Sequence, residues 1–111
     1  MTRLRSLSAF FPAYNEEKNV PAMVERLTAV LPPVSDDYEI VVVNDGSSDG
    51  TAAVADALAA ADPHVRVVHH PVNRGYGGAL KSGFTAGRKE YVFFTDGDGQ
   101  FDVGEIGRLL P

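Results

Sequence analysis

The chain of 111 residues contains no cysteine and no tryptophan, and its acidic residues outnumber its basic ones. Without cysteine it can form no disulfide framework, no thiolate metal site and no cysteine nucleophile. Ten Lys and Arg residues against 15 Asp and Glu residues give a formal net charge of −5, so no general positive field attracts phosphate backbones or anionic lipid. We therefore expect no nucleic-acid partner.

A long hydrophobic run is also missing. Arg3 and Arg5 precede an apolar stretch, but Ser6, Ser8 and Pro12 interrupt it before it reaches the length of a signal peptide or the roughly 18 apolar residues of a membrane-spanning helix. We therefore expect a cytoplasmic protein, whose membrane segments, if any, lie outside this chain and hold it at the cytoplasmic face of a membrane.

Short apolar runs alternate with helix-like segments along the chain, whose 44% hydrophobic residues suffice for one core. The runs, rich in β-branched and aromatic residues, predict strands at 7–11, 38–43, 65–69 and 91–95. The segments between them predict helices at 15–31, 50–61 and 77–87. Because crossovers between parallel strands are right-handed, this order predicts an α/β fold with an open, mostly parallel sheet and helices on both faces. We expect one domain over residues 1–111.

The helix ends carry capping signals. Asn15 is expected to cap the first helix, with Glu16 and Glu17 in its first turn. One of the polar residues at 47–49 is expected to cap the second helix. In the third helix, the expected buried residues are Ala79, Leu80, Phe84 and Ala86.

Polar and glycine residues gather in the segments that follow the expected strands, at 12–16, 44–50, 71–78 and 96–100. In open α/β sheets, ligands bind beyond the carboxyl ends of the strands, where the strand order reverses. The composition of these segments therefore predicts a binding site at that edge.

Two carboxylates separated by one residue follow the fourth expected strand, in Asp96-Gly97-Asp98. Gly97 permits the turn that lets them converge, and oxygen ligands of this kind suit Mg²⁺ or Mn²⁺. Gln100 would add an outer ligand. Taken alone, the same residues also fit a solvated acidic turn.

Asp45 leaves the most apolar strand and is placed to accept a hydrogen bond from a planar N–H group such as the edge of a nucleobase. Gly46 would let a ligand approach the backbone there. The other interpretation is an ordinary Asp-Gly turn.

The glycine-rich segment 75–78 opens the third helix, a place where anions bind readily, and Arg74 and Lys81 bring positive charge nearby. A tight helix entry with surface charges explains the same residues. His64, His69 and His70 have no convincing metal or triad spacing, so we assign none of them a role.

An aspartate after a buried strand also fits a phospho-acceptor receiver domain. That domain requires an acidic pair at the end of the first strand and a lysine after a late strand. Glu16, Glu17 and Lys81 instead lie in expected helices, so the match is poor.

Four segments, in this order, resemble the sequence blocks of one family: Phe11-Pro12-Ala13-Tyr14-Asn15-Glu16-Glu17, Val43-Asn44-Asp45-Gly46-Ser47-Ser48-Asp49-Gly50-Thr51, Asn73-Arg74-Gly75-Tyr76-Gly77-Gly78-Ala79-Leu80 and Asp96-Gly97-Asp98-Gly99-Gln100. Each block is weak alone, but four in register are specific. The chain resembles the nucleotide-binding half of an inverting GT-A glycosyltransferase of family 2, in the branch of dolichol-phosphate mannose synthases and polyprenyl-phosphate sugar transferases.

This resemblance implies functions for particular residues. It implies a nucleotide-sugar site made of Pro12, Ala13, Tyr14, Glu16, Asp45, Gly75, Gly77, Lys81, Asp96, Gly97 and Asp98. Within this site Asp45 would meet the base, and Asp96, Asp98 and Gln100 would hold Mg²⁺ or Mn²⁺ against the diphosphate. The ion would neutralise the charge that develops on the departing nucleoside diphosphate.

The implied activity is transfer of a sugar from a UDP- or GDP-sugar to a polyprenyl or dolichyl phosphate, with inversion. Family members continue into an acceptor-binding half, so we expect a chain truncated before that half, with no catalytic base assignable here. The alternative is a non-catalytic fragment that binds nucleotide sugars. Since the missing half would leave a sheet edge and apolar surface exposed, we also expect self-association.

Overall fold

The computed structural model describes residues 5–89 and 91–94. Strands and helices alternate through them in the predicted order. The elements are β1 (Leu7–Ala13), α1 (Val20–Val30), β2 (Tyr38–Asp45), α2 (Thr51–Ala61), β3 (Val65–His70), α3 (Gly75–Ala86) and β4 (Tyr91–Phe94). A bilayer-spanning helix needs about 20 residues. None of these three helices exceeds 12 residues, and none qualifies as a membrane span.

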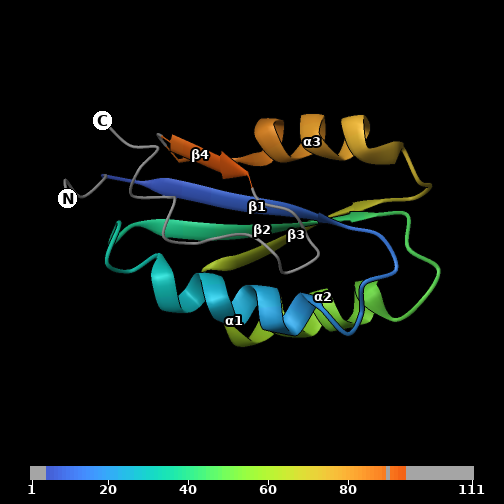
Figure 1. Cartoon of the computed structure of the whole chain (residues 1–111), viewed down its shortest axis with the longest axis horizontal. Helices are drawn as coiled ribbons and strands as arrows, with labels where there is room; N and C mark the ends of the chain where they lie inside the picture. The colour runs from blue at the N-terminus through green and yellow to red at the C-terminus, as the bar shows by residue number, and fades with distance from the viewer. Residues whose placement is uncertain (1–4, 90, 95–111) are drawn as a thin grey trace.

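The strands form one parallel sheet in the order β3-β2-β1-β4. Helices α1 and α2 cover one face and α3 covers the other (Figure 1). The predicted fold class is therefore confirmed. The chain runs outward from β1 through β2 to β3, then returns by way of α3 to place β4 on the other side of β1. The strand order thus reverses between β1 and β4, and ligands bind beyond the carboxyl ends of strands at such a point.

Strand β2 is the centre of the core, and all eight of its residues are buried. Side chains alternate between the two faces of a strand, so this strand serves two apolar layers. Ile40 and Val42 pack under α1 and α2, whereas Val41 and Val43 pack under α3. A strand covered on both faces needs apolar residues at successive positions, which explains its continuous apolar run.

Helix α3 lies close to the sheet because Gly83 faces Phe10. A Cβ at Gly83 would come within 2.0 Å of the Phe10 ring. The prediction that Phe84 is buried is wrong, because this side chain is 54% exposed and touches Phe10 only edge-on, with the ring centroids 4.9 Å apart. The buried stripe of α3 runs instead through Ala79 and Gly83, with Leu80 and Ala86 partly buried beside it.

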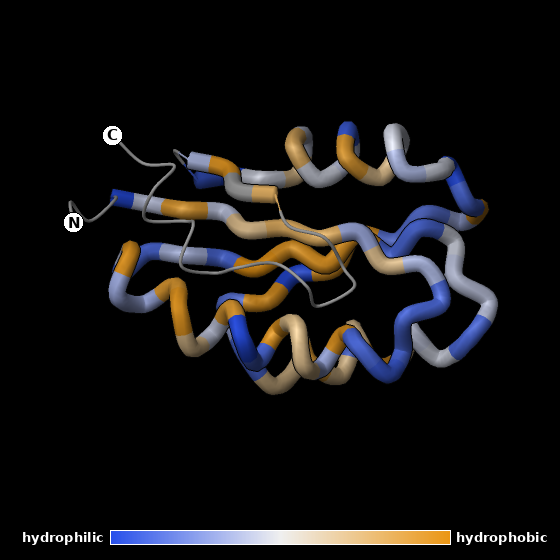
Figure 2. The backbone as a smooth tube through the Cα atoms, in the orientation of Figure 1, coloured by the Kyte–Doolittle hydropathy of each residue, from blue (hydrophilic) through white to orange (hydrophobic). Residues whose placement is uncertain are grey.

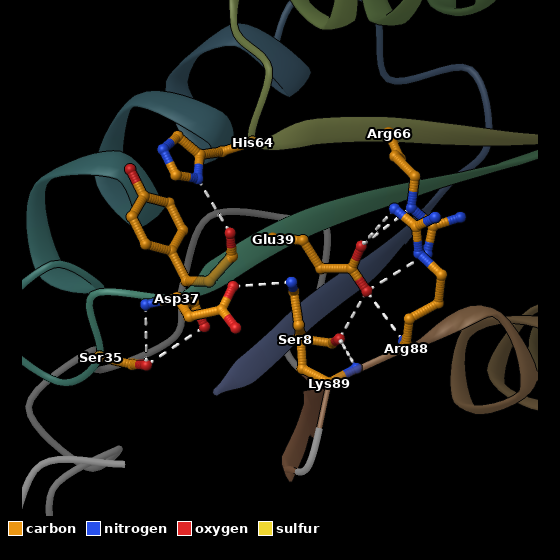
Figure 3. A network of polar contacts seen from close by, with 9 residues as sticks. Ser8, Ser35, Asp37, Glu39, His64, Arg66, Arg88 and Lys89 are labelled. Atoms are coloured by element: carbon orange, nitrogen blue, oxygen red, sulfur yellow. Dashed lines mark hydrogen bonds and ion pairs between the residues drawn. The ribbon is translucent and has the colours of Figure 1, made fainter. Parts of the chain in front are cut away.

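At the amino end of β2, the buried Glu39 carboxylate holds three segments together (Figure 3). It accepts hydrogen bonds from Ser8 Oγ at 2.6 Å, from Arg66 Nε at 2.9 Å and from the backbone N–H of Arg88 at 2.9 Å. Ser8 Oγ in turn accepts a hydrogen bond from the Lys89 N–H at 3.1 Å. The turn between α3 and β4 is therefore fastened to β1, β2 and β3.

The same contacts set the charge of this group. Burial raises the pKa of the Glu39 carboxyl, but the hydrogen bonds from Arg66, Ser8 and the Arg88 N–H outweigh burial and lower the pKa to about 2. Glu39 is therefore ionised at neutral pH.

Candidate functional site

The loops after β1, β2 and β3 meet at the carboxyl edge of the sheet. In Figure 2 these loops are mostly hydrophilic, whereas the strands that lead into them are mostly hydrophobic. Hydrogen bonds between side chains and backbone join each loop to the next. The sequence predicts this clustering of polar segments, and the parallel strands produce it.

Asn15 links the loop after β1 to the loop after β2. Its Oδ1 accepts hydrogen bonds from the N–H groups of Ser48 at 2.8 Å and Asp49 at 3.3 Å, and its own N–H donates to Ser47 Oγ at 3.0 Å. The residue has a φ of 54°, a left-handed conformation that Asn tolerates better than most residues.

The prediction that Asn15 caps α1 is therefore wrong, since its side chain serves the neighbouring loop. The helix begins at Val20, with Asn19 in the N-cap position and Pro21 in the first turn. Glu16 and Glu17 consequently lie before the helix and not in its first turn.

Asp49 lies at the start of α2, where its Oδ1 accepts hydrogen bonds from the Thr51 hydroxyl and from the Thr51 N–H, the latter at 2.9 Å. The prediction that one of residues 47–49 is the cap of α2 is wrong, because Gly50 is the N-cap residue of this helix. Asp49 lies one position earlier and its carboxylate still accepts the exposed N–H of Thr51, the first helical residue. The Thr51 hydroxyl is the main cause that lowers the pKa of the Asp49 carboxyl. Thr51 Oγ1 also accepts the N–H of Glu16 at 2.9 Å, which ties the loop after β1 to α2.

The Asp45 carboxylate is only 5% exposed and accepts three hydrogen bonds from residues of β3 and of the loop after β3. Its Oδ1 accepts from His70 Nδ1 at 2.7 Å and from the Arg74 N–H at 2.8 Å. Its Oδ2 accepts from Asn73 Nδ2 at 3.0 Å. Burial raises the pKa of Asp45, but the hydrogen bonds from His70 and the Arg74 N–H outweigh burial and lower it.

This carboxylate lies where α3 begins, since Arg74 is the N-cap residue of that helix. The sequence predicts that an anion binds readily at this helix start. In the structure a carboxylate of the chain itself accepts the Arg74 N–H there, which the positive end of a helix dipole favours.

The close approach that Gly46 allows is made by the chain itself. Gly46 has a φ of 69°, and a Cβ there would lie 2.2 Å from the backbone nitrogen of Asn73. The expectation that a ligand approaches the backbone at Gly46 stays a prediction, since the contact with Asn73 concerns only the side of the glycine that a Cβ would occupy. The loop after β3 fills that space and brings Asn73 to Asp45.

Sequence reasoning missed the histidines of β3. His70 is buried and bridges Asp45 to Ser82 of α3, with a distance of 2.7 Å from His70 Nε2 to Ser82 Oγ. His69 is exposed on the other side of the strand and contacts Asn44 and Asp56. The signal was the strand register, because Asp45 and His70 are direct partners across β2 and β3.

Other predicted site residues lie around this edge. Pro12 and Ala13 end β1, Tyr14 is 50% exposed, and Glu16 is partly buried.

Gly75 and Gly77 form the first turn of α3, and a Cβ at either position would meet open space. Lys81 lies farther along the helix, in a cavity of about 510 Å³ that it shares with Arg74, Ser82 and Thr85. Among the described residues, no atom lies within 4 Å of a Cβ placed at Gly75 or Gly77.

The predicted metal residues Asp96, Asp98 and Gln100, together with Gly97, lie outside the described residues. The strand that precedes them in the sequence is described. β4 (Tyr91–Phe94) runs parallel to β1 and leads toward the carboxyl edge directly before this segment. Within residues 5–89 and 91–94, no group of three or more His, Asp or Glu side chains is arranged to hold a metal ion.

An open parallel sheet with helices on both faces and polar loops at its carboxyl edge defines a doubly wound α/β domain, a fold in which ligands bind at that edge. Residues 8–111 match the family model "Glycosyl transferase family 2". The chain belongs to this family, and the resemblance predicted from its four sequence blocks is confirmed.

The relatives lie in the branch that the sequence predicts. The chain is 44% identical over 103 residues to the polyprenol monophosphomannose synthase of Mycolicibacterium smegmatis, covering 89% of this chain and 37% of the relative. It is 38% identical over 109 residues to the undecaprenyl-phosphate 4-deoxy-4-formamido-L-arabinose transferase of Serratia proteamaculans. This match covers 96% of the present chain and 33% of the relative. The chain thus spans about a third of the length of these curated relatives.

Solved structures share the fold. A mannosyltransferase from Pyrobaculum calidifontis, in complex with GDP-Man and Mn²⁺, superposes with a TM-score of 0.76 at 28% identity and covers 87% of this chain and 28% of its own. A second neighbour is a glucosyl-3-phosphoglycerate synthase from Mycobacterium tuberculosis in complex with Mn²⁺, UDP and glucosyl-3-phosphoglycerate. It superposes with a TM-score of 0.66 at 30% identity, and the match covers 85% of the present chain and 34% of the synthase. The predicted GT-A architecture is confirmed.

Proposed function

We propose that the complete protein is an inverting, metal-dependent glycosyltransferase that transfers a sugar from a UDP- or GDP-sugar to a polyprenyl or dolichyl phosphate. The present chain is the part that binds the donor. The observation that carries the proposal is the set of linked loops at the carboxyl edge, built from the sequence blocks of a family 2 glycosyltransferase. The names of the relatives support both substrate classes, since they specify polyprenyl phosphates and the neighbours contain GDP-Man or UDP.

Each residue near this edge has a task in the proposal. Asp45 accepts an N–H of the base, while Pro12, Ala13, Tyr14 and Glu16 surround the nucleoside. Tyr14 offers an exposed ring on which a base can stack. Gly75 and Gly77 shape the wall beside the base and ribose, where the structure leaves open space, and Lys81 is an outer neighbour of that wall.

The metal residues are Asp96, Asp98 and Gln100, with Gly97 allowing the turn between the two carboxylates. Two carboxylates and an amide oxygen form a donor set suited to Mg²⁺ or Mn²⁺. A divalent ion held there would neutralise the negative charge that develops on the leaving nucleoside diphosphate. Because a lipid-phosphate acceptor already carries an oxyanion, it needs no strong base to remove a proton. We assign no catalytic base in this chain.

Calorimetric titration of UDP and GDP tests donor binding. We expect one of the two to bind in the presence of Mn²⁺ or Mg²⁺, and the affinity to fall at least tenfold in chelator or in the Asp98→Ala variant. Asp102→Ala removes the same charge four positions farther along the sequence and is the matched control, with affinity unchanged. Equal affinity with metal and with chelator would contradict the proposed site.

Two further parts of the proposal concern the setting of the protein. We infer that it works at the cytoplasmic face of a membrane, where a lipid-phosphate acceptor is found. We also infer that this chain alone self-associates, since Tyr76 and Phe84 are exposed on α3 and β4 is an edge strand in the described sheet. Sedimentation over a range of concentrations should show dimers or larger species, and a strictly monomeric profile would contradict self-association.

A further inference from the structure

His70 is a buried titratable side chain that the proposed function does not use. It lies between two elements, with its Nδ1 2.7 Å from Asp45 Oδ1 and its Nε2 2.7 Å from Ser82 Oγ. The His70 side chain is 3% exposed and that of Asp45 is 5% exposed, so water does not compete for the contact between them.

The charge of Asp45 determines which ring nitrogen of His70 carries a proton. An ionised carboxylate only accepts hydrogen bonds, so the 2.7 Å contact requires a proton on Nδ1 of His70. Nε2 of the same ring lies 2.7 Å from Ser82 Oγ, and the serine hydroxyl can either donate to this nitrogen or accept from it. Ser82, His70 and Asp45 thus form a chain of hydrogen bonds that links α3, β3 and β2.

The order serine, histidine, aspartate is also that of a hydrolytic triad, but this arrangement lacks the rest of such a site. Ser82 lies in the interior of α3 (Gly75–Ala86), where the backbone N–H groups are used in the helix. Among the described residues, no pair of free N–H donors therefore lies beside Ser82 to stabilise an oxyanion. The chain of hydrogen bonds positions a carboxylate and does not activate a nucleophile.

Among the side chains that hold Asp45, His70 is the one fixed within the sheet. Asn73, the other side-chain donor, lies on the loop after β3 and is exposed. His70 Nδ1 and the Arg74 N–H both donate to Oδ1, so they direct Oδ2 toward the loop side of the carboxylate. Oδ2 accepts a hydrogen bond from Asn73 there, and a carboxylate oxygen can accept a second one.

We propose that His70 is the positioning residue of the nucleotide site: its Nδ1–H and its contact with Ser82 hold Asp45 with Oδ2 directed at the N–H edge of the base. The inference rests on the proposed function, in which Asp45 meets the base. His70 itself does not touch the nucleotide.

Two substitutions separate the Nδ1 contact from simple packing. In His70→Asn the amide nitrogen lies the same number of bonds from Cα as Nδ1, so the donor to Asp45 is kept. In His70→Gln the amide lies at the distance of Nε2, so that donor is lost. Nucleotide affinity is measured by calorimetry with Mn²⁺, alongside the midpoint of thermal unfolding.

We expect His70→Gln to weaken nucleotide binding about tenfold or more, since a hydrogen bond to a charged group is lost. His70→Asn should restore most of that affinity even if both variants melt at a similar temperature. His69→Gln is the matched control, because this neighbouring histidine bonds Asn44 and Asp56 and not Asp45. Its affinity should equal that of the unaltered protein.

Equal losses in the Asn and Gln variants, or no loss in either, would overturn the role of His70. If the unaltered protein binds neither UDP nor GDP with metal, the proposed function itself is wrong and this inference falls with it. Should His70→Gln fail to fold, NMR of the unaltered protein decides. The Nδ1–H proton of His70 should be visible and should shift when nucleotide is added, and an unshifted signal at saturation would overturn the proposal.

Discussion

Strand β2 carries a buried carboxylate near each end, and the two are held in different ways. Glu39, at the amino end, is bonded by the guanidinium groups of Arg66 and Arg88. Asp45, at the carboxyl end, is bonded by an imidazole, a side-chain amide and a backbone N–H. Within the described residues, the side chains that bond Asp45 are those of His70 and Asn73, and no lysine or arginine side chain is among them.

We propose that this difference separates a structural site from the site for the nucleotide. The two guanidinium groups neutralise the Glu39 carboxylate and join it to β3 and to the α3–β4 turn. The charge of Glu39 therefore stabilises the fold. The donors around Asp45 hold it at the carboxyl end of β2, where in the proposed function its Oδ2 accepts an N–H group of the base. We therefore expect changes at Glu39 to alter stability and changes at Asp45 to alter binding.

The largest expected effect on stability is that of Glu39→Ala. Removal of this carboxylate leaves Ser8, Arg66 and the Arg88 N–H without their common acceptor, and the loss of one member of a buried ion pair typically costs about 3–5 kcal/mol. Urea unfolding followed by circular dichroism measures the change. Nucleotide affinity should stay the same in the folded fraction, and a loss of affinity larger than tenfold would break the separation of the two ends.

Acid should remove a comparable amount of stability. The folded-state pKa of Glu39 is about 2, lowered from an ordinary value of 4.5. A carboxyl group whose pKa is lower in the folded state than in the unfolded state stabilises the fold at pH values above its unfolded-state pKa. This stability is lost as the pH falls toward the folded-state pKa, and for Glu39 the loss is roughly 3 kcal/mol between about pH 5 and pH 2. The free energy of unfolding should fall over that range and fall much less in Glu39→Gln. Parallel curves for the two proteins would contradict the assignment.

Asp45→Asn should have a smaller effect on stability and a clear effect on binding. Its amide would face the donors of His70 and Asn73, one of which then loses its acceptor, at a cost of about 1–2 kcal/mol. We expect nucleotide affinity to fall about tenfold to a hundredfold, as for the loss of a hydrogen bond to a charged group. Calorimetry with Mn²⁺ measures this, with Glu39→Gln as the control that leaves affinity intact. Unchanged affinity in Asp45→Asn would show that the base does not meet this carboxylate.

The two arginines that bond Glu39 should contribute unequally to stability, and substitution of Arg88 should give the smallest effect of the series. Arg66 is 30% exposed and bonds Glu39 through both Nε and Nη2, so Arg66→Ala should cost about 2 kcal/mol. The Arg88 side chain is 67% exposed, and its backbone N–H bond to Glu39 survives substitution, so Arg88→Ala should cost less than about 1 kcal/mol. Urea unfolding of both variants checks the order, and a larger loss at Arg88 would reverse our interpretation of this cluster.

The carboxyl end of β2 was the more predictable of the two. The alternation of apolar runs predicts the sheet, and the polar loops with Asp45 predict the edge that carries the site. These features depend on residues close together in sequence. The partners of Asp45 and Glu39 are 25 to 49 residues away along the chain, and only the strand register and the packing of α3 bring them together. The prediction that Asn15 caps its helix failed for the same reason. Its side chain bonds residues 33 and 34 positions away and not the helix that follows it.

The most direct test of the central claim is a crystal structure of the protein with Mn²⁺ and whichever of UDP and GDP binds. We expect the base to lie against Asp45 Oδ2, with His70 still bonded to Oδ1, and the ion to lie between the diphosphate and the carboxylates of Asp96 and Asp98. A nucleotide bound elsewhere, for example in the cavity beside Lys81 with Asp45 untouched, would contradict it.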